Sequence, residues 1–291
     1  MKALVSLIVI NYKVEKEIIT CISSIINSKP KVSFEIIVVD NDSDSKLKDV
    51  LRRNFPQVKY MESPRNIGYG AGNNLGAKLA TGNYLFFLNP DTIVQKDSVD
   101  ILFNFVKNNS MSGMVAPLLL DLSGNVYPNQ GSSEYNFKSA IVTSSFINKF
   151  FPNNSISRKF FHANWNKKEV EEFDVVPGTA FIIKKTLFER VGMFDEKFFL
   201  YFEEYDLAKR IKKLGYKNYI IPEAKVLHIW EASTKKRKDI NKIFSQSRYL
   251  FFEKHHGSFF ALIINIVSNF GKYEFLLSLI IILFIILIFS K

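Results

Sequence analysis

The feature that most constrains the fold of this chain is a series of short apolar runs separated by helical patterns. Residues 5–10 and 34–40 are nearly continuous apolar runs rich in valine and isoleucine, which is typical of strands buried on both faces. Between them, Ile18, Ile22 and Ile25 recur at helical spacing on one face. Strand and helix alternate in this way along most of the chain, which predicts an α/β domain whose mainly parallel central sheet has flanking helices.

The other elements follow from the same patterns. Strands are predicted at 58–63, 84–88, 112–120, around 173–185 with a bend at Pro177, and late in the chain within 216–230; helices are predicted at 47–55, 71–80, 98–107 and 203–214. Residues 123–172 are polar, aromatic and irregular, and we expect an insertion there. Long irregular segments inside compact domains are usually functional or disordered, so this insertion is a candidate part of a binding site.

The chain is basic, with a formal net charge of +11 and a pI near 9.4. Much of the excess lies in the KKRKDINK run, 235–242, close to the C-terminus. No nucleic-acid-binding motif occurs, so we expect no nucleic acid partner. Cys21 is the only cysteine, which excludes an intrachain disulfide and fits a reducing cytoplasm.

The C-terminal residues form a strongly apolar segment, without a charge between Phe275 and Ser290. The segment is slightly shorter than the ~20 residues of a usual membrane-spanning helix. It could span with its flanks, embed partly, form a hairpin with the apolar residues before it, or be a buried helix. Basic and aromatic residues precede it, as suits the cytoplasmic face of an anionic membrane. We therefore predict a main domain at 1–235, a basic and aromatic membrane-proximal segment at 236–258, and an apolar membrane-associated tail at 259–291.

Three predicted strands end in polar residues that would meet at one edge of the sheet. The first strand is followed by Asn11 and Tyr12, the second ends at Asp40, and the strand at 84–88 runs into Asn89-Pro90-Asp91. Each of these could simply be a turn, because Asn and Asp favour turns. In open α/β sheets, however, ligands bind beyond the carboxyl ends of the strands, so all three together favour a binding site.

Two further groups could carry chemistry. Glu203 and Glu204 begin a helix, where acids are also favoured simply by the helix dipole. The aromatic run before them would give a partly apolar setting that raises a carboxylate pKa towards that of a general base. His228 ends a late strand, where it could be structural or could join Asp91 in an oxygen-and-imidazole site for Mg²⁺ or Mn²⁺.

The glycine-rich stretch at 66–76, NIGYGAGNNLG, resembles a phosphate-binding loop only superficially. Asn73 stands where the dinucleotide fingerprint requires its third glycine, and the stretch does not follow the first strand. Nicotinamide binding is therefore disfavoured, and the glycines could equally permit close backbone packing.

Taken in order along the chain, these segments resemble family 2 glycosyltransferases of the GT-A fold, with the closest likeness to the rhamnosyltransferase-like branch. The segments that carry the resemblance are VSLIVINYKVEKEIITCISSI, IIVVDNDSDS, NIGYGAGNNLGAKLATGNYLFFLNPDT, VPGTAFIIKKTLFERVGMFDEKFFLYFEEYDLAKRIKKLGYK and LHIWEAST. They cover most of residues 5–234 in the order of the family.

The resemblance implies a role for each candidate residue. Residues implied to hold the nucleotide sugar donor are Asn11, Tyr12, Asp40, Asn66, Asn74, Asn89 and Asp91. Asn89-Pro90-Asp91 stands where many relatives carry Asp-x-Asp, so Asp91 is implied to bind the metal, with His228 completing the shell. The FEEYDL segment matches the motif that carries the catalytic base, which implies Glu204 in that role with Glu203 as the alternative.

The implied function is metal-assisted, inverting transfer of a sugar from a nucleotide-diphosphate donor. By resemblance the donor is dTDP-rhamnose, and the acceptor is a lipid-linked or polysaccharide glycan at the cytoplasmic face of the cell membrane. One alternative is a nucleotidyltransferase, although the expected basic phosphate loop after the first strand is absent from NYKVEKE. Another is a non-catalytic, membrane-bound sugar-binding or scaffold protein on the same fold.

Overall fold

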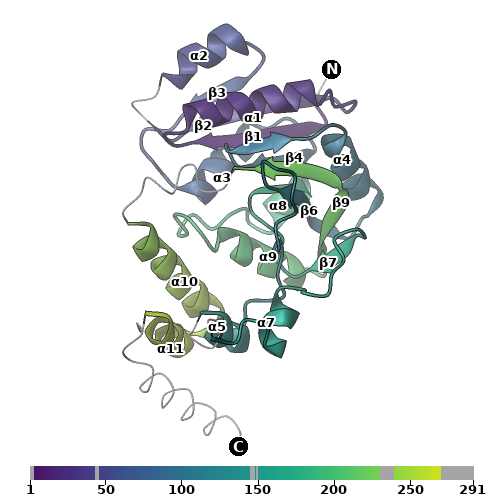
Figure 1. Ribbon diagram of the computed structural model, residues 1–291. Helices are drawn as coiled ribbons and strands as arrows, with labels where there is room; N and C mark the ends of the chain where they lie inside the picture. The colour runs from purple at the N-terminus through teal and green to yellow at the C-terminus, as the bar shows by residue number, and fades with distance from the viewer. Residues whose placement is uncertain (1–2, 43–45, 145–147, 149, 230–238, 270–291) are drawn as a thin grey trace, which may run out of the picture.

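A nine-stranded mixed sheet forms the centre of the protein in the computed structural model, which describes residues 3–42, 46–144, 148, 150–229 and 239–269 (Figure 1). The strands are β1 (Val5–Asn11), β2 (Phe34–Asp40), β3 (Lys59–Glu62), β4 (Tyr84–Leu88), β5 (Thr92–Val94), β6 (Ser112–Leu120), β7 (Glu171–Phe173), β8 (Ala180–Lys184) and β9 (Lys217–His228). Their order across the sheet is β3-β2-β1-β4-β8-β6-β9-β5. Strand β5 pairs with the C-terminal part of β9, and β7 pairs with the N-terminal part of β9.

Helices cover both faces of this sheet. They are α1 (Glu15–Asn27), α2 (Leu47–Asn54), α3 (Tyr69–Leu79), α4 (Ser98–Asn108), α5 (Phe137–Ser144), α7 (Ser155–Phe160), α8 (Lys185–Arg190), α9 (Glu203–Lys213), α10 (Ile240–His256) and α11 (Ser258–Asn269). Helices α1, α2 and α4 contribute to one core, and α3, α8 and α9 to the core on the opposite face. The alternation within β1 explains this arrangement, because Leu7 and Val9 enter the first core while Ile8 and Ile10 enter the second.

The prediction of a mainly parallel sheet needs correction. The pairings β1–β2, β1–β4, β2–β3 and β6–β9 are parallel, whereas β4–β8, β6–β8, β5–β9 and β7–β9 are antiparallel. Strand β8 returns through the middle of the sheet between β4 and β6. A buried strand has the same apolar pattern in either direction, so the sequence pattern did not indicate this reversal.

The insertion at 123–172 is more ordered than its irregular sequence indicates. It contains α5 and α7 and ends in β7. These two helices join α10 and α11 in a third apolar cluster, which lies at the lower end of the molecule in Figure 1. Aromatic rings dominate this cluster: Tyr135 and Phe251 contact each other, and both contact Phe202 and Phe252.

The C-terminal segments also differ from the predicted division. Phe251 and Phe252 of α10 are buried in the third cluster, as are Ala261 and Ile264 of α11. Residues 240–269 are therefore part of the folded body, although the prediction placed 259–269 in a separate tail. Across the described residues, no helix combines the length and apolarity needed to cross a bilayer. Residues 270–291, on which most of the predicted tail falls, lie outside the described part of the chain.

Candidate active site

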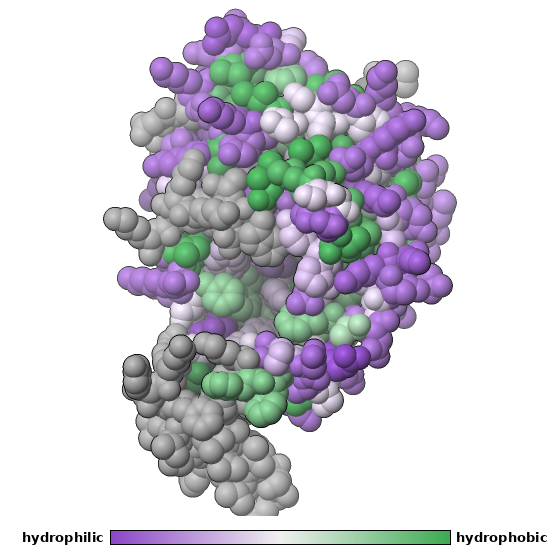
Figure 2. All heavy atoms as spheres, viewed as in Figure 1, coloured by the Kyte–Doolittle hydropathy of each residue, from purple (hydrophilic) through white to green (hydrophobic). Residues whose placement is uncertain are grey.

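A cavity of about 430 Å³ opens where the carboxyl ends of the parallel strands face the beginning of α9. Figure 2 shows the surface hollowed between the sheet and the lower helices. Seven of the predicted site residues line the cavity: Tyr12, Asn66, Asn89, Asp91, Glu203, Glu204 and His228. The structure therefore brings these distant segments to one cavity, because each follows a strand end or begins a helix at one edge of the sheet.

Asn11 and Asp40 lie behind the cavity wall and do not line it. They are register partners at the ends of β1 and β2, and both are completely buried. The side-chain amide of Asn11 donates to Asp40 Oδ1 at 2.8 Å, and the hydroxyl of Tyr60 donates to Asp40 Oδ2 at 2.9 Å. This network fixes the two strand ends, so that their successors Tyr12 and Asn41 face the cavity instead.

The two predicted donor asparagines of the glycine-rich stretch separate in space. Asn66 lines the cavity, and its side-chain oxygen accepts a hydrogen bond from the backbone of Gly68 at 3.0 Å. Asn74 is buried on α3 outside the cavity, where it donates to the carbonyl of Phe194 and to Glu196 and accepts from Phe194 N. Asn74 therefore holds the segment that leads towards α9.

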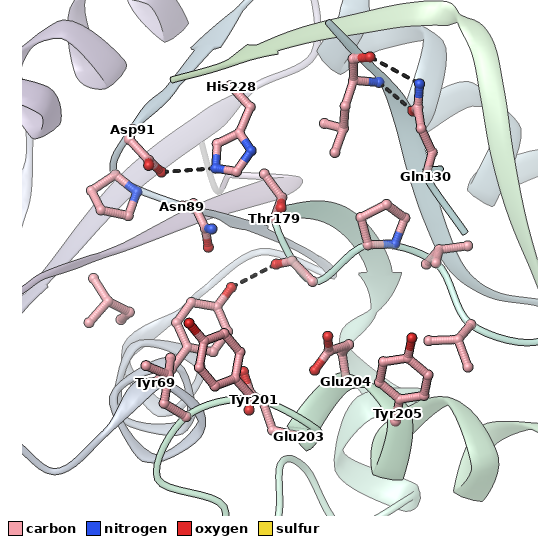
Figure 3. A pocket seen from close by; sticks show the side chains of 18 of the residues that line it. Tyr69, Asn89, Asp91, Gln130, Thr179, Tyr201, Glu203, Glu204, Tyr205 and His228 are labelled. Carbon is pink, nitrogen blue, oxygen red and sulfur yellow. Dashed lines mark hydrogen bonds and ion pairs between the residues drawn. The ribbon is translucent and has the colours of Figure 1, made fainter. Parts of the chain in front are cut away.

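One wall of the cavity carries a carboxylate and an imidazole side by side (Figure 3). Strand β5 pairs with the end of β9, with Thr92 opposite His228, which brings the preceding Asp91 next to the imidazole. Nε2 of His228 lies 3.3 Å from Oδ1 of Asp91, and both side chains are almost completely buried. The hydroxyl of Tyr127 donates to the carbonyl of His228 at 2.9 Å, which holds the strand end.

Asn89 stands beside this pair at the end of β4. Its backbone N–H donates to the carbonyl of Thr179 at 2.8 Å, continuing the β4–β8 pairing beyond Leu88 and Ala180. The reversed strand β8 thus brings the Gly178-Thr179 segment to the cavity, a contribution that the sequence did not reveal.

The opposite wall carries Glu203 and Glu204 at the beginning of α9 (Figure 3). The two preceding residues, Tyr201 and Phe202, have φ angles of +70° and +68°. Non-glycine residues at positive φ cost roughly 1–3 kcal/mol each and persist only where surrounding contacts hold them. Phe202 is buried among the rings of Tyr135, Tyr205 and Phe251, so the aromatic cluster stabilises the turn that directs the glutamates into the cavity.

Burial raises the pKa of both carboxyl groups. The pKa of Glu203 lies well above its ordinary value because of burial and the neighbouring charge of Glu204. Burial raises the pKa of Glu204 to about 7. The Oε2 atoms of both are buried and have no hydrogen-bond partner among the described residues. A raised pKa and an acceptor oxygen without a hydrogen-bond partner, on a residue that lines a cavity, are properties of a general base.

Two close backbone approaches shape this wall. A Cβ atom on Gly178 would lie 3.3 Å from Cβ of Glu204, so the glycine allows that side chain to lie against the backbone. Gly68 has a φ of +92°, and a Cβ there would lie 2.4 Å from the carbonyl oxygen of Phe199. The hydroxyl of Tyr69 donates to the carbonyl of Gly178 at 2.8 Å and links the two segments.

Several lining residues were missed by the sequence reasoning. They include Asn41, Tyr69, Tyr127, Gln130, Thr179, Tyr201 and Tyr205. Asn41 and Tyr205 directly follow the predicted residues Asp40 and Glu204, and Tyr201 lies two residues before Glu203, so these positions were an available signal. Gln130 lies in the insertion and forms paired hydrogen bonds with the backbone of Leu119, for which the sequence carried no pattern.

A second polar chain lies near the cavity but is structural. Ser133 Oγ lies 3.1 Å from His162 Nε2, and His162 Nδ1 lies 3.2 Å from Glu171 Oε1, in the order of a hydrolytic triad. The serine hydroxyl also contacts the carbonyl of Lys159, and its backbone N–H donates to Phe160. These contacts join the end of α7 to β7 and leave the serine N–H unavailable as an oxyanion donor.

Residues 6–192 match the family described as Glycosyl transferase family 2. The chain belongs to this family. The match includes Asn89, Asp91 and the glycine-rich stretch, and it ends before α9. Membership of this family argues against the nucleotidyltransferase and the non-catalytic scaffold considered as alternatives.

Relatives support the rhamnosyltransferase-like branch of this glycosyltransferase family. The chain is 25% identical over 204 residues to the N-acetylglucosaminyl-diphospho-decaprenol L-rhamnosyltransferase of Mycobacterium tuberculosis, across 66% of each chain. It is 24% identical over 202 residues to rhamnosyltransferase WbbL of Escherichia coli, covering 67% of this chain and 72% of that protein. The chain thus matches about two thirds of the length of these relatives.

Solved structures show that the fold is GT-A-like. GalNAc-T7 with UDP, GalNAc and Mn²⁺ superposes with a TM-score of 0.62 at 18% identity, covering 82% of this glycosyltransferase and 46% of that chain. Staphylococcus aureus TarS 1–349 superposes with a TM-score of 0.52 at 16% identity, covering 92% and 70%.

Proposed function

We propose that this glycosyltransferase transfers a sugar from a nucleotide-diphosphate donor with inversion at the anomeric carbon. The observation that carries the proposal is the pairing of two walls across one cavity. Asp91 and His228 form one wall, and the raised-pKa carboxyls of Glu203 and Glu204 form the other. A donor diphosphate on the first wall would place its sugar between the two.

The residues of the first wall fit a divalent cation. The described residues contain no group of three His, Cys, Asp or Glu side chains that could hold a metal. Asp91 and His228 would supply two ligands, and donor phosphate oxygens and water would supply the rest, a ligand set that suits Mg²⁺ or Mn²⁺. When bound, the cation would supply positive charge that stabilises the departing diphosphate. Asn89 would hydrogen-bond the donor.

The second wall supplies the base. In our proposal the acceptor hydroxyl oxygen attacks the anomeric carbon, its proton passes to Glu204, and the bond from that carbon to the diphosphate oxygen breaks. Attack from the face opposite the leaving group inverts the anomeric configuration. We assign the base to Glu204 because it lines the cavity and is partly exposed, whereas Glu203 is buried, and because Gly178 allows the Glu204 side chain to lie along the wall. The neighbouring charge of Glu204 adds to burial in raising the pKa of Glu203.

We further propose dTDP-rhamnose as the donor and a lipid-linked or polysaccharide glycan as the acceptor. The two rhamnosyltransferase relatives support the donor, and the decaprenol-linked acceptor in one of their names supports the acceptor class. Asn11 and Asp40 would act by fixing the strand ends beside Tyr12 and Asn41 at the nucleotide. The apolar sequence of residues 270–291 supports a location at the cytoplasmic membrane face.

Thermal shifts and transfer assays together test the assignments. Purified protein is screened against nucleotide sugars with and without Mg²⁺ or Mn²⁺, because a bound donor raises the melting temperature. Asp91→Asn should remove the metal-dependent part of the donor shift. Glu204→Gln should keep that shift and lower kcat by roughly 10²–10⁴-fold, the usual contribution of a general base.

The exposed Glu169 provides a matched control, since Glu169→Gln should change neither readout. Metal-dependent transfer by Asp91→Asn would exclude the metal assignment. If Glu203→Gln loses transfer while Glu204→Gln retains it, the base is Glu203. The anomeric configuration of the product, read by NMR, decides between inversion and retention.

A further inference from the structure

Helices α5, α7 and α11 lie at the lower end of the molecule (Figure 1), and large apolar side chains on α11 and just before α7 are exposed. Phe150 and Phe151 precede α7 and are 64% and 67% exposed, while Phe259 and Leu262 of α11 are 63% and 51% exposed. Helix α11 packs on α5, and the rings of Phe137 and Phe260 lie 4.7 Å apart. These four exposed side chains therefore belong to elements that pack together.

Positive charge accompanies this apolar surface. Residues 135–168 contain no Asp or Glu but six Lys or Arg residues. Of these, Lys138 of α5 and Arg158 and Lys159 of α7 are exposed. In Figure 2, apolar and strongly hydrophilic side chains lie beside one another at this end of the molecule. We call the set Lys138, Phe150, Phe151, Arg158, Lys159, Phe259 and Leu262 the aromatic-basic surface.

The composition of this surface fits one kind of partner. Exposed phenylalanine and leucine gain free energy when they enter the headgroup region of a bilayer, and each nearby Lys or Arg adds about 1 kcal/mol on an anionic membrane. A 34-residue segment without a carboxylate suits a continuous anionic surface. The same helices lie next to the catalytic cavity, because Phe161, which lines it, directly follows α7.

We propose that the aromatic-basic surface docks this glycosyltransferase onto an anionic lipid bilayer, independently of residues 270–291. The proposal rests on the proposed lipid-linked acceptor for its biological purpose but not for its physical basis. Docking through α5, α7 and α11 would bring the insertion side of the cavity close to the headgroups. The hydroxyl of a lipid-linked acceptor would then reach Glu204 while the lipid stays in the bilayer.

The depth of one side chain in the bilayer tests the proposal in the full chain. Phe151→Trp is mixed with phosphatidylglycerol vesicles that contain lipids brominated near the headgroup, and fluorescence is compared with that of the unmodified chain. Leu4→Trp is the control, because Leu4 is exposed beside the start of β1 at the upper end of Figure 1. We expect brominated lipid to quench the Trp at 151 at least two-fold more than the Trp at 4.

The charge requirement is tested on the same probe. Adding Arg158→Glu and Lys159→Glu to Phe151→Trp should lower that quenching, since each lost cation weakens binding about five-fold. Replacing phosphatidylglycerol with phosphatidylcholine should have the same effect. Equal quenching at positions 151 and 4 would overturn the proposal, as would quenching at 151 that is independent of lipid charge.

Separate readouts distinguish failure of this proposal from failure of the proposed function. Vesicle quenching needs no donor, so it does not depend on transfer activity. Phe150→Ser with Phe151→Ser should keep transfer to a water-soluble acceptor and lose most transfer to a lipid-linked acceptor in vesicles. Equal loss with both acceptors would contradict a docking role, whereas docking by a chain that transfers no sugar would contradict only the proposed function.

Discussion

Burial of the adjacent carboxyl groups of Glu203 and Glu204 affects both the proposed catalysis and the pH dependence of folding stability. Burial raises both pKa values above the ordinary Glu value of about 4.3. As the pH rises above that value, the unfolded chain loses these protons before the folded chain does. Stability contributed by the protonated carboxyls is therefore present at acidic pH and is lost as the pH rises through the folded-state pKa near 7.

This loss of stability with rising pH gives a prediction for Glu204→Gln. The variant lacks one of the two buried carboxyl groups whose ionisation destabilises the fold. Its free energy of unfolding should therefore fall less steeply than that of the unmodified chain between pH 5 and pH 8. Urea denaturation midpoints measured across this range would show the difference. Parallel curves for the two proteins would mean that Glu204 ionises normally in the fold.

Gly178 gives a second prediction at this scale. Its added Cβ would lie 3.3 Å from Cβ of Glu204, closer than side chains usually approach, so Gly178→Ala should displace the carboxyl by a few tenths of an ångström. Because small misplacements of reacting groups are costly, we expect kcat to fall roughly 10- to 100-fold. Steady-state kinetics check this, and an unchanged kcat would place the base elsewhere on the wall.

At the scale of elements, α10 holds the segment that carries the glutamates. Its Ser247 donates to the carbonyl of Leu200 at 2.8 Å, and its Phe251 packs on Phe202. Lys254 and His255 contact the completely buried carboxylate of Asp206 at 2.6 and 2.7 Å. Successive turns of α10 thus contact the strained turn before α9 and the first turns of α9. The position of the strained turn and of the start of α9 therefore depends on the C-terminal region.

Phe251→Ala should therefore affect both folding and chemistry. Removing this ring, which is 1% exposed, should cost about 3–5 kcal/mol of unfolding free energy. It should also lower kcat, because Phe202 loses a neighbour that holds its positive φ. Phe259→Ala is the matched control, since its ring is 63% exposed and the change should stay within about 0.5 kcal/mol. Equal stability of the two variants would contradict the assignment of α10 to the core.

The elements also show what the sequence could and could not predict. Strands β1, β2, β4 and β6 have uninterrupted apolar patterns, and their predicted bounds agree closely with those of the structure. The reversal of β8 left no trace in its pattern, and the three-residue β5 is too short to show one. Asp40 was expected near the donor because polar residues at a strand end look alike whether they line a cavity or support its wall, and Asn74 was expected there only from the family resemblance.

At the scale of the whole molecule, the boundary of the folded body decides how the tail is tested. A chain that ends at residue 269 keeps α11, whose Ala261 and Ile264 are buried, whereas a deletion from 259 removes them. We expect the chain ending at 269 to keep its donor-dependent thermal shift and its melting temperature. Its sedimentation with anionic vesicles should become salt-sensitive, because only the aromatic-basic surface remains.

Sedimentation at 50 mM and 500 mM salt measures this change. The full chain should sediment at both concentrations and the shortened chain only at the lower one. If the shortened chain sediments equally at both, residues 270–291 do not contribute to membrane binding. A deletion from 259 should instead lower the melting temperature, which separates loss of folding from loss of binding.

The insertion leaves the sheet after β6 and returns through β7 to β8, and β6 pairs directly with β8. Its two ends are thus fixed beside each other by the sheet, so its length and content can change at little entropic cost. The residues proposed to hold the donor, from Tyr12 to Asp91, precede it in the chain, and only the proposed metal ligand His228 follows it. An exchange of this segment that keeps Tyr127, which holds the strand end at His228, and Tyr135, which packs on Phe202, can therefore change the acceptor while the nucleotide-binding half is inherited unaltered.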